Sequence, residues 1–464
     1  MRTLIHTHIQ IKESEASWLG YLRKFMKKNE LIITEENIKK TLKDNVLNRN
    51  EKLIQLIKLL DILEDNYIIS IDGGWGTGKT FYIKQLLYLY EYEDCGSCLE
   101  EENKIYIENF RKKYVPIYYN AWENDNHIDV LQSIIYNILE TFPKYKSDIN
   151  TKKQDFKSII KPCLINIIEK TTFGYITKDI LDSISSFEDL SEEIVTVEEK
   201  KKCLYEIFDL LTKNDTRILL VIDELDRCKP DYAVKTLETI KHFFDYQKIT
   251  TIVLTNNNQL SKCIKHFYGE DFNGYEYLNK IYDTVLSLEI ENLEDYIVKY
   301  LDFQDNGYLS EKVFYSIIKY LGFSLRECNS LKSMYEVSAK YINLSYGLSS
   351  EEYLIPSNIF LVIGLALKIQ NIEEYNEYIK GNADNFIKNF FNFFTDFQND
   401  SENTTWLLRI FNVANKELLI TKILEKYHET FMRVNNIHKY PILDALSLLG
   451  KLSNYTESKD NIKN

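Results

Sequence analysis

Four of the chain's fifteen glycines fall between Gly73 and Gly78, directly before Lys79 and Thr80. The stretch, GGWGTGKT, satisfies the pattern GxxxxGK[ST]. Glycines let successive backbone N–H groups converge on one anion with no Cβ in the way, and the N-terminus of a following helix adds partial positive charge. These residue types at this spacing therefore predict a phosphate-binding loop.

The expected contacts divide between the loop and the first helical turn. Lys79 would reach the β and γ phosphates of a nucleoside triphosphate, and the Thr80 hydroxyl would ligate a Mg²⁺ that bridges them. The residues predicted to bind the nucleotide are Gly73, Gly74, Trp75, Gly76, Thr77, Gly78, Lys79, Thr80 and Phe81.

A pair of carboxylates follows a second apolar run, ILLVIDELDRCKP. Asp223 ends the run and is expected to hold Mg²⁺ through a water, while Glu224 is expected to polarise the water that attacks the γ-phosphate. A phosphate loop alone also fits a nucleotide kinase. The adjacent carboxylates favour hydrolysis over transfer to a second substrate.

Two further residues are candidates for contacts near the γ-phosphate. The run TIVL leads into Asn256, whose amide would sit beside the attacking water. Arg326, in GFSLREC, would neutralise transition-state charge from the start of a helix outside the sheet. The predicted catalytic residues are therefore Lys79, Glu224, Asn256 and Arg326.

Short apolar runs rich in β-branched and aromatic residues predict the strands that position these groups. They are Tyr67–Ile71, Tyr114–Tyr119, Ile218–Ile222 and Thr251–Leu254, with Val285–Ile290 as a fifth. Helical patterns separate the runs, so we expect one α/β domain with a parallel sheet.

The remaining segments have apolar residues at helical spacing and are predicted to be helical. We expect a helical N-terminal extension over residues 1–45, a sheet domain over 46–292 with a helical insert at about 145–211, and an α-helical C-terminal domain over 293–464. An aromatic stripe in the last domain has the spacing of one helix face and is expected to be core. Its members are Phe386, Phe390, Phe393, Phe394 and Phe397.

Composition limits the classes of partner. The 464 residues are 44% hydrophobic and carry a net charge of −13, so nucleic acid would meet a repulsive average surface.

The longest apolar stretch, Ile359–Leu367, is about half of what a membrane-spanning helix needs. The N-terminus lacks the apolar core of a secretory signal, and the one CxxC, Cys95 to Cys98, has no second pair at zinc-site spacing. We therefore expect a cytoplasmic location and cysteines that remain free thiols.

At these residues the chain resembles the KAP NTPases, a family of P-loop ATPases. The resemblance is carried by GGWGTGKT, by NAW at Asn120–Trp122, by IDELDRCKPDYAVKTLETIKHFF, by YLNKIYD near Tyr277 and by FSLRE at Phe323. It covers residues 46 to about 335. It implies the fold class α/β, a P-loop NTPase with a five-stranded mainly parallel sheet followed by an α-helical domain. It also implies a strand between the P-loop strand and the acidic strand.

The resemblance further implies ATP and Mg²⁺ as ligands and Arg326 as a sensor-like residue. Bacterial relatives are similar to phage-exclusion proteins, which favours an ATPase of anti-phage defence. Many members carry transmembrane hairpins inside the P-loop domain, whereas the insert here, Thr151–Leu211, is too polar to span a membrane. The family often has aspartate at the position of Asn256.

Three functions remain in competition at this point. The first is an ATPase switch, and the second is an ATP-binding scaffold whose helical domain recruits an effector protein with little turnover. The third is a nucleic-acid motor, which would need a basic track and stacking aromatics. A homo-oligomer is expected if Arg326 or Lys280 acts across a subunit boundary.

Overall fold

The computed structural model describes residues 32–92, 99, 101–126, 129–145, 196–212, 215–301, 311–346, 351–396, 401–431, 433–434, 437–438 and 446. They form two compact units, one spanning Ile33–Glu289 and one that begins at Ile290. Several sequence predictions fall outside the described residues. These are the extension before Ile32, Cys95 and Cys98, residues 146–195 of the insert, and Phe397.

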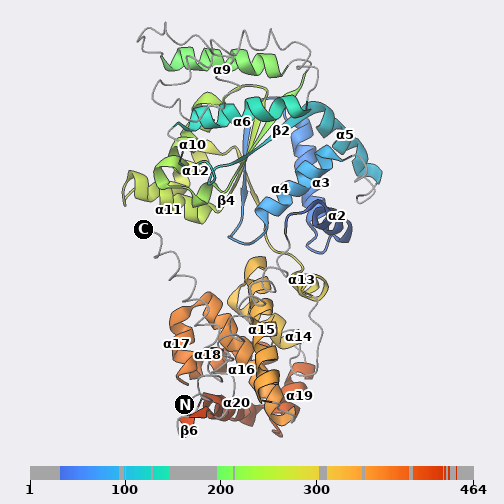
Figure 1. The fold of residues 1–464 in the computed structure, drawn as a ribbon, viewed down its shortest axis with the longest axis vertical. Coiled ribbons are helices and arrows are strands. Elements are labelled where there is room, and N and C mark those ends of the chain that lie inside the picture. The colour runs from blue at the N-terminus through green and yellow to red at the C-terminus, as the bar shows by residue number, and fades with distance from the viewer. Residues whose placement is uncertain are drawn as a thin grey trace, which may run out of the picture. The chain divides into compact units, whose positions relative to one another are not determined.

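The first unit is built on a five-stranded sheet in the order β2-β3-β4-β1-β5, with every neighbouring pair parallel (Figure 1). The strands are β1 (Tyr67–Asp72), β2 (Tyr114–Asn120), β3 (Arg217–Asp223), β4 (Ile249–Thr255) and β5 (Thr284–Ser287). Strand β4 lies between β1, which leads into the glycine-rich loop, and β3, which ends in the carboxylates. The predicted sheet and its intervening strand are confirmed.

Alternation along the strands builds two cores, because successive side chains point to opposite faces of a sheet. In β3, Ile218, Leu220 and Ile222 enter the core on one face, and Leu219 and Val221 enter the core on the other. All seven residues of β3 and all seven of β4 are buried. Both central strands are therefore covered on both sides, as their uninterrupted apolar sequences predict.

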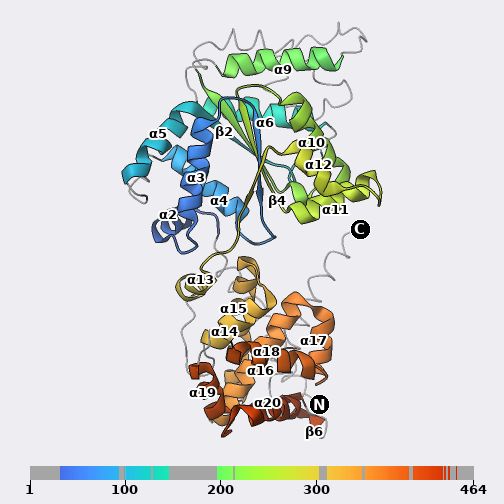
Figure 2. The ribbon, with the colours of Figure 1, turned by 180° about the vertical axis from the view of Figure 1, so that it is seen from behind.

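Helices cover both faces of the sheet, as Figures 1 and 2 show. One face carries α2 (Glu35–Asp44), α3 (Arg49–Ile62), α4 (Lys79–Glu91) and α5 (Lys104–Lys113), with the short helix η2 (Glu101–Asn103) before α5. The other face carries α6 (Val130–Tyr145), α9 (Val197–Leu211), α10 (Pro230–Phe243), α11 (Asn257–Tyr268) and α12 (Gly274–Ile281). The short helix η6 (Leu225–Arg227) joins β3 to α10.

Local sequence sets the ends of these helices. Pro230 occupies the first turn of α10, where its missing N–H costs nothing, and Ala233, Leu237 and Ile240 then face the core. The α2 helix, within the predicted N-terminal extension, starts at a Thr34 cap and is tied to α4 by a 3.0 Å hydrogen bond from the Gln85 amide to the Thr41 hydroxyl.

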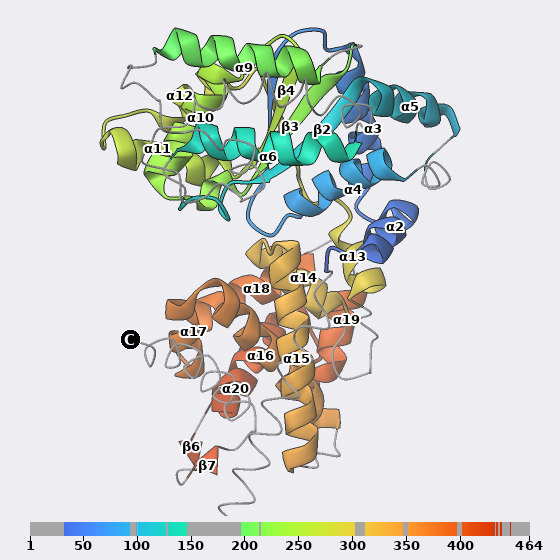
Figure 3. The ribbon, with the colours of Figure 1, turned by 45° about the horizontal axis from the view of Figure 1, so that its top comes forward.

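Helices dominate the described part of the second unit, which Figure 3 shows with α15 and α16 labelled near its centre. The helices are α13 (Leu293–Tyr300), α14 (Glu311–Leu321), α15 (Leu325–Tyr346), α16 (Glu351–Gln370), α17 (Ile372–Ile379), α18 (Asp384–Asp396), α19 (Ser401–Ile410) and α20 (Lys416–Phe431). Two short strands follow, β6 (Arg433–Val434) and β7 (Ile437–His438).

The apolar stretch predicted to be too short for a membrane span lies in α16 and packs inside this unit. Ile359 to Ile363 and Leu365 to Leu367 are fully buried. Among the described residues no helix has the length and apolar character needed to cross a bilayer. Within the aromatic stripe on α18, Phe386, Phe390 and Phe394 are buried as predicted, whereas Phe393 is half-buried.

Candidate functional site: a phosphate loop beside two carboxylates

The glycine-rich loop connects β1 to α4 and is anchored at its start. The Gly73 N–H donates to the Thr255 carbonyl of β4 at 3.1 Å. A Cβ on Gly73 would lie 2.9 Å from the Thr77 hydroxyl and 3.1 Å from the Leu288 carbonyl, so a side chain there would require these neighbours to shift. Gly76 and Gly78 have φ of 77° and 87°, a left-handed conformation that glycine adopts without steric cost.

The loop ends at the N-terminus of α4. Gly78 is the N-cap residue, and the first intrahelical hydrogen bond runs from the Tyr82 N–H to the Gly78 carbonyl at 2.9 Å. The N–H groups of Lys79, Thr80 and Phe81 therefore precede that bond, which is the arrangement that binds phosphate. The Phe81 side chain packs against the core, so its predicted contact with nucleotide would come from its backbone.

Lys79 lies across the loop. Its Nζ donates to the Gly73 carbonyl at 2.7 Å and to the Gly74 carbonyl at 3.2 Å. Burial lowers the pKa of Lys79 below its usual value, while the carboxylates of Asp226, Asp223 and Asp72 oppose that shift. The ammonium is thus half-buried, and the charges of three carboxylates and of Arg227 act on it.

Asp223 ends β3 and is held from two sides. Its Oδ2 accepts a hydrogen bond from the Tyr118 hydroxyl of β2 at 2.8 Å, and its Oδ1 accepts from the Glu224 N–H at 2.8 Å. Lys84 of α4 places its Nζ 3.2 Å from the centre of the Tyr118 ring. Asp223 is only 1% exposed, so these contacts set the direction of its carboxylate.

Glu224 follows in a left-handed conformation, with φ of 59° and ψ of 28°. Only a few per cent of residues other than glycine adopt this conformation. Oε1 of Glu224 forms a 2.9 Å ion pair with Nη1 of Arg227. Burial raises the pKa of Glu224 above its usual value, and the Arg227 charge opposes the rise.

One hydrogen bond joins the loop to the acidic turn. The Trp75 indole N–H donates to Oδ2 of Asp226 at 2.6 Å. Trp75 is 50% exposed, whereas Asp226 is buried. Since parallel strands end at one edge of the sheet, this contact brings the phosphate loop and the Asp223–Glu224 pair into one site.

Asn256 follows β4 at the same edge of the sheet. Its Oδ1 accepts from the Gln259 N–H at 3.3 Å and so caps α11. Thr255, the residue before it, pairs in register with Asp72 and binds the start of the loop. Asn256 thus belongs to the same unit as the loop, and its role at the γ-phosphate stays a prediction.

Arg326 belongs to the other unit. It is exposed in the first turn of α15, a helix that begins with reciprocal hydrogen bonds between Ser324 and Glu327. Within the unit that holds the loop, the structure instead brings Arg227 beside Glu224. The action of Arg326 on the nucleotide stays a prediction.

The profile of the KAP family P-loop domain matches residues 48–319, more than half of the chain. The chain belongs to the KAP family. Its P-loop NTPase fold, with five parallel strands, agrees with that membership. No curated protein matches this KAP-family sequence.

Two solved structures illustrate how loosely the whole chain superposes on other proteins. The ORC2 protein of Aeropyrum pernix, in ADPNP and ADP complexes, is 12% identical with a TM-score of 0.30, covering 92% of this chain and 95% of that one. A Walker-type ATPase of Pyrococcus abyssi is 12% identical with a TM-score of 0.31, covering 88% and 97%. At such scores neither likeness bears on the function of the KAP-family chain.

Four contacts of this KAP-family site go beyond the sequence predictions. Tyr118 orients Asp223, Asp226 binds Trp75, and Arg227 binds Glu224. Arg49, the first residue of α3, is buried and donates from Nη2 to the Thr77 carbonyl at 2.5 Å. Asp226 and Arg227 lie within the motif IDELDR, so the sequence around Glu224 could have indicated them. Arg49 and Tyr118 are distant in the sequence, and only the folded structure brings them to the site.

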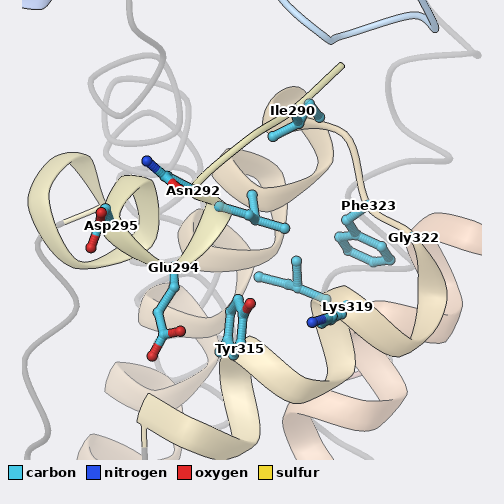
Figure 4. Close-up of a pocket in the computed structure, with 10 residues that line it drawn as sticks. Ile290, Asn292, Glu294, Asp295, Tyr315, Lys319, Gly322 and Phe323 are labelled. Atoms are coloured by element: carbon cyan, nitrogen blue, oxygen red, sulfur yellow. The ribbon is translucent and has the colours of Figure 1, made fainter. Parts of the chain in front are cut away.

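A separate cavity of about 550 Å³ lies in the helical unit, around α13 and α14 (Figure 4). Its walls include the polar groups of Glu294, Tyr315 and Lys319. Burial raises the pKa of Tyr315, and the Glu294 charge adds to the rise. This cavity is formed entirely within the second unit and contains none of the predicted nucleotide contacts.

Proposed function

We propose that this protein binds ATP with Mg²⁺ and hydrolyses it. The observation that carries the proposal is the 2.6 Å hydrogen bond from Trp75 to Asp226, because it joins the phosphate loop to the acidic turn. A cradle for a triphosphate and a candidate base for water thereby share one site. Family membership supports the same activity.

The residues present fit a magnesium ion. Asp223 offers an oriented carboxylate and Thr80 a hydroxyl in the first turn of α4, and Mg²⁺ prefers such oxygen ligands. The described residues contain no cluster of three or more His, Cys, Asp or Glu that would hold a metal alone. Magnesium would therefore complete its coordination with phosphate oxygens and water, and when bound it would neutralise charge on the transferred phosphoryl group.

The reaction divides among the residues of the chain. Lys79 and the N–H groups at the start of α4 bind the phosphates, with Lys79 exchanging the Gly73 carbonyl for a phosphate oxygen. A water attacks the γ-phosphorus, the bond to the β–γ bridging oxygen breaks, and Glu224 accepts the proton of the water. The products are ADP and inorganic phosphate.

Two variants test the activity. Lys79→Ala should abolish ATP binding, measured by calorimetry. Glu224→Gln should bind ATP with near wild-type affinity and release phosphate at least about 100-fold more slowly, the scale of a lost general base. Equal phosphate release by wild type and Glu224→Gln would remove Glu224 from its role.

A scaffold that holds ATP without turnover is the competing function, and one assay separates the two. Multiple-turnover phosphate release by the full chain in the absence of any partner supports the ATPase. Tight ATP binding with no release supports the scaffold. Salt-sensitive binding of DNA or RNA in the presence of ATP would favour a motor instead.

We further propose that turnover drives a switch in anti-phage defence, with the helical unit recruiting a protein partner. The resemblance to phage-exclusion proteins supports this role. Cells expressing the wild-type chain should show reduced plaque formation, and cells expressing Lys79→Ala should not. Association of subunits, with Arg326 acting on a neighbour's nucleotide, predicts a larger species by size exclusion with ATP than without it.

A further inference from the structure

Arg227 occupies a fixed position between a carboxylate and an aromatic ring. Its Nη1 lies 2.9 Å from Oε1 of Glu224, and its guanidinium carbon lies 5.4 Å from the centre of the Trp122 ring. The two partners of the ion pair are three residues apart across η6, where a 3₁₀ helix places side chains i and i+3 on the same side. Their side chains are 29% and 17% exposed, so solvent screens the pair only partly.

Asn120 completes the arrangement from the neighbouring strand. It pairs in register with Asp223 at the ends of β2 and β3. Its Oδ1 accepts from the N–H groups of Trp122 and Glu123 at 3.1 and 3.3 Å. The Ala121 N–H donates to the Asp223 carbonyl at 2.9 Å, so the turn that carries Trp122 is tied to the residue before Glu224.

We infer that Arg227 is a positioning residue for Glu224: its guanidinium, held over Trp122, fixes the carboxylate in the orientation that receives the proton of the attacking water. The inference rests on the proposed ATPase function. A planar guanidinium suits this task because it can stack on the indole and donate in its own plane to the carboxylate at the same time.

Two substitutions in the full chain test the inference. Arg227→Ala should leave the affinity for a slowly hydrolysed ATP analogue within about twofold and lower kcat at least about tenfold. Arg227→Lys keeps the charge but not the planar fork. It should leave the analogue affinity at its wild-type value and give a kcat between those of Arg227→Ala and wild type.

A matched control removes a cation that makes no contact with Glu224. Lys235 lies on the exposed side of α10, 4.0 Å from Asp231, and Lys235→Ala should leave kcat unchanged. Wild-type kcat in Arg227→Ala would overturn the inference. So would a parallel loss of analogue affinity, because the cation would then act on the nucleotide.

Failure of the inference is distinguishable from failure of the proposed function. If Glu224→Gln abolishes turnover while both Arg227 variants behave as wild type, the ATPase assignment stands and the positioning role falls. If Arg227→Ala does not fold, Arg227→Lys still decides: wild-type kcat in that variant contradicts a need for the guanidinium fork.

Discussion

The Tyr118 hydroxyl donates a 2.8 Å hydrogen bond to Oδ2 of Asp223 across the β2–β3 pair. The hydrogen bond holds a buried carboxylate at the end of β3, the edge of the sheet at which β1 also leads into the phosphate loop. The hydroxyl is also held in its protonated form, since burial and the Asp223 charge raise the Tyr118 pKa.

Tyr118→Phe removes that donor and keeps the ring beneath Lys84. A lost hydrogen bond to a charged group is worth about 1.5–3 kcal/mol, so we expect the Mg²⁺ concentration for half-maximal phosphate release to rise about tenfold. A magnesium titration measures this. Tyr67→Phe is the matched control, since it removes a 2.7 Å bond to Thr284 at the start of β1. Equal magnesium dependence in the two variants would contradict the role of Tyr118.

Gly78→Ala places a Cβ on a residue with φ of 87°. The left-handed conformation costs about 1–2 kcal/mol for an L-residue, so we expect a lower melting temperature together with a loss of ATP affinity. Gly322 of the helical unit has φ of 68° and open space, with no heavy atom within 4 Å of the position that a Cβ would take. Gly322→Ala should destabilise similarly and leave ATP affinity intact; loss of affinity in both variants would point to general unfolding.

Trp75→Phe removes the donor to Asp226 and leaves an aromatic ring in the loop. Because the bond is charge-assisted, we expect ATP affinity to fall about five- to tenfold, a change of about 1–1.4 kcal/mol. Calorimetry measures the affinity. Trp406→Phe, on α19 of the helical unit and beside Phe394, should bind ATP as wild type does. Unchanged affinity in Trp75→Phe would mean that the loop holds its shape without the tryptophan bond.

Glu224→Gln should also change the pH dependence of stability. The folded pKa of Glu224 lies above the unfolded value, so the folded state binds more protons and loses stability as pH rises through that window. Replacement by the neutral amide removes this loss. The melting temperature of the variant minus that of wild type should therefore increase as the pH rises from 4 to 8. Thermal melts across this pH range measure the difference. A difference in melting temperature that stayed constant would contradict the role given to the Glu224 pKa.

Sequence patterns predicted the elements that depend on local chemistry. The glycine-rich loop and the central strands follow from residues that are adjacent in the chain, and β1, β3 and β4 form where their apolar runs lie. Phe81 shows the limit of a motif, because the pattern marks its backbone but does not reveal that its side chain packs into the core.

Side-chain contacts between elements that are distant in the chain could not be predicted from the sequence. Tyr118 meets Asp223 only because β2 pairs with β3 in a particular register, and Arg49 reaches Thr77 only because α3 packs beside the loop. Neither relationship has a local pattern. Arg227 was within a recognised motif, yet its partner could be assigned only once η6 placed it on the same side as Glu224.

The left-handed backbone at Glu224 has a consequence for redesign of this chain. Glycine would relieve about 1 kcal/mol or more of local strain at that position. A sequence optimised for thermal resistance alone would therefore replace the side chain proposed to act as the base. Under the proposed function, folding stability and catalysis favour different residues at position 224.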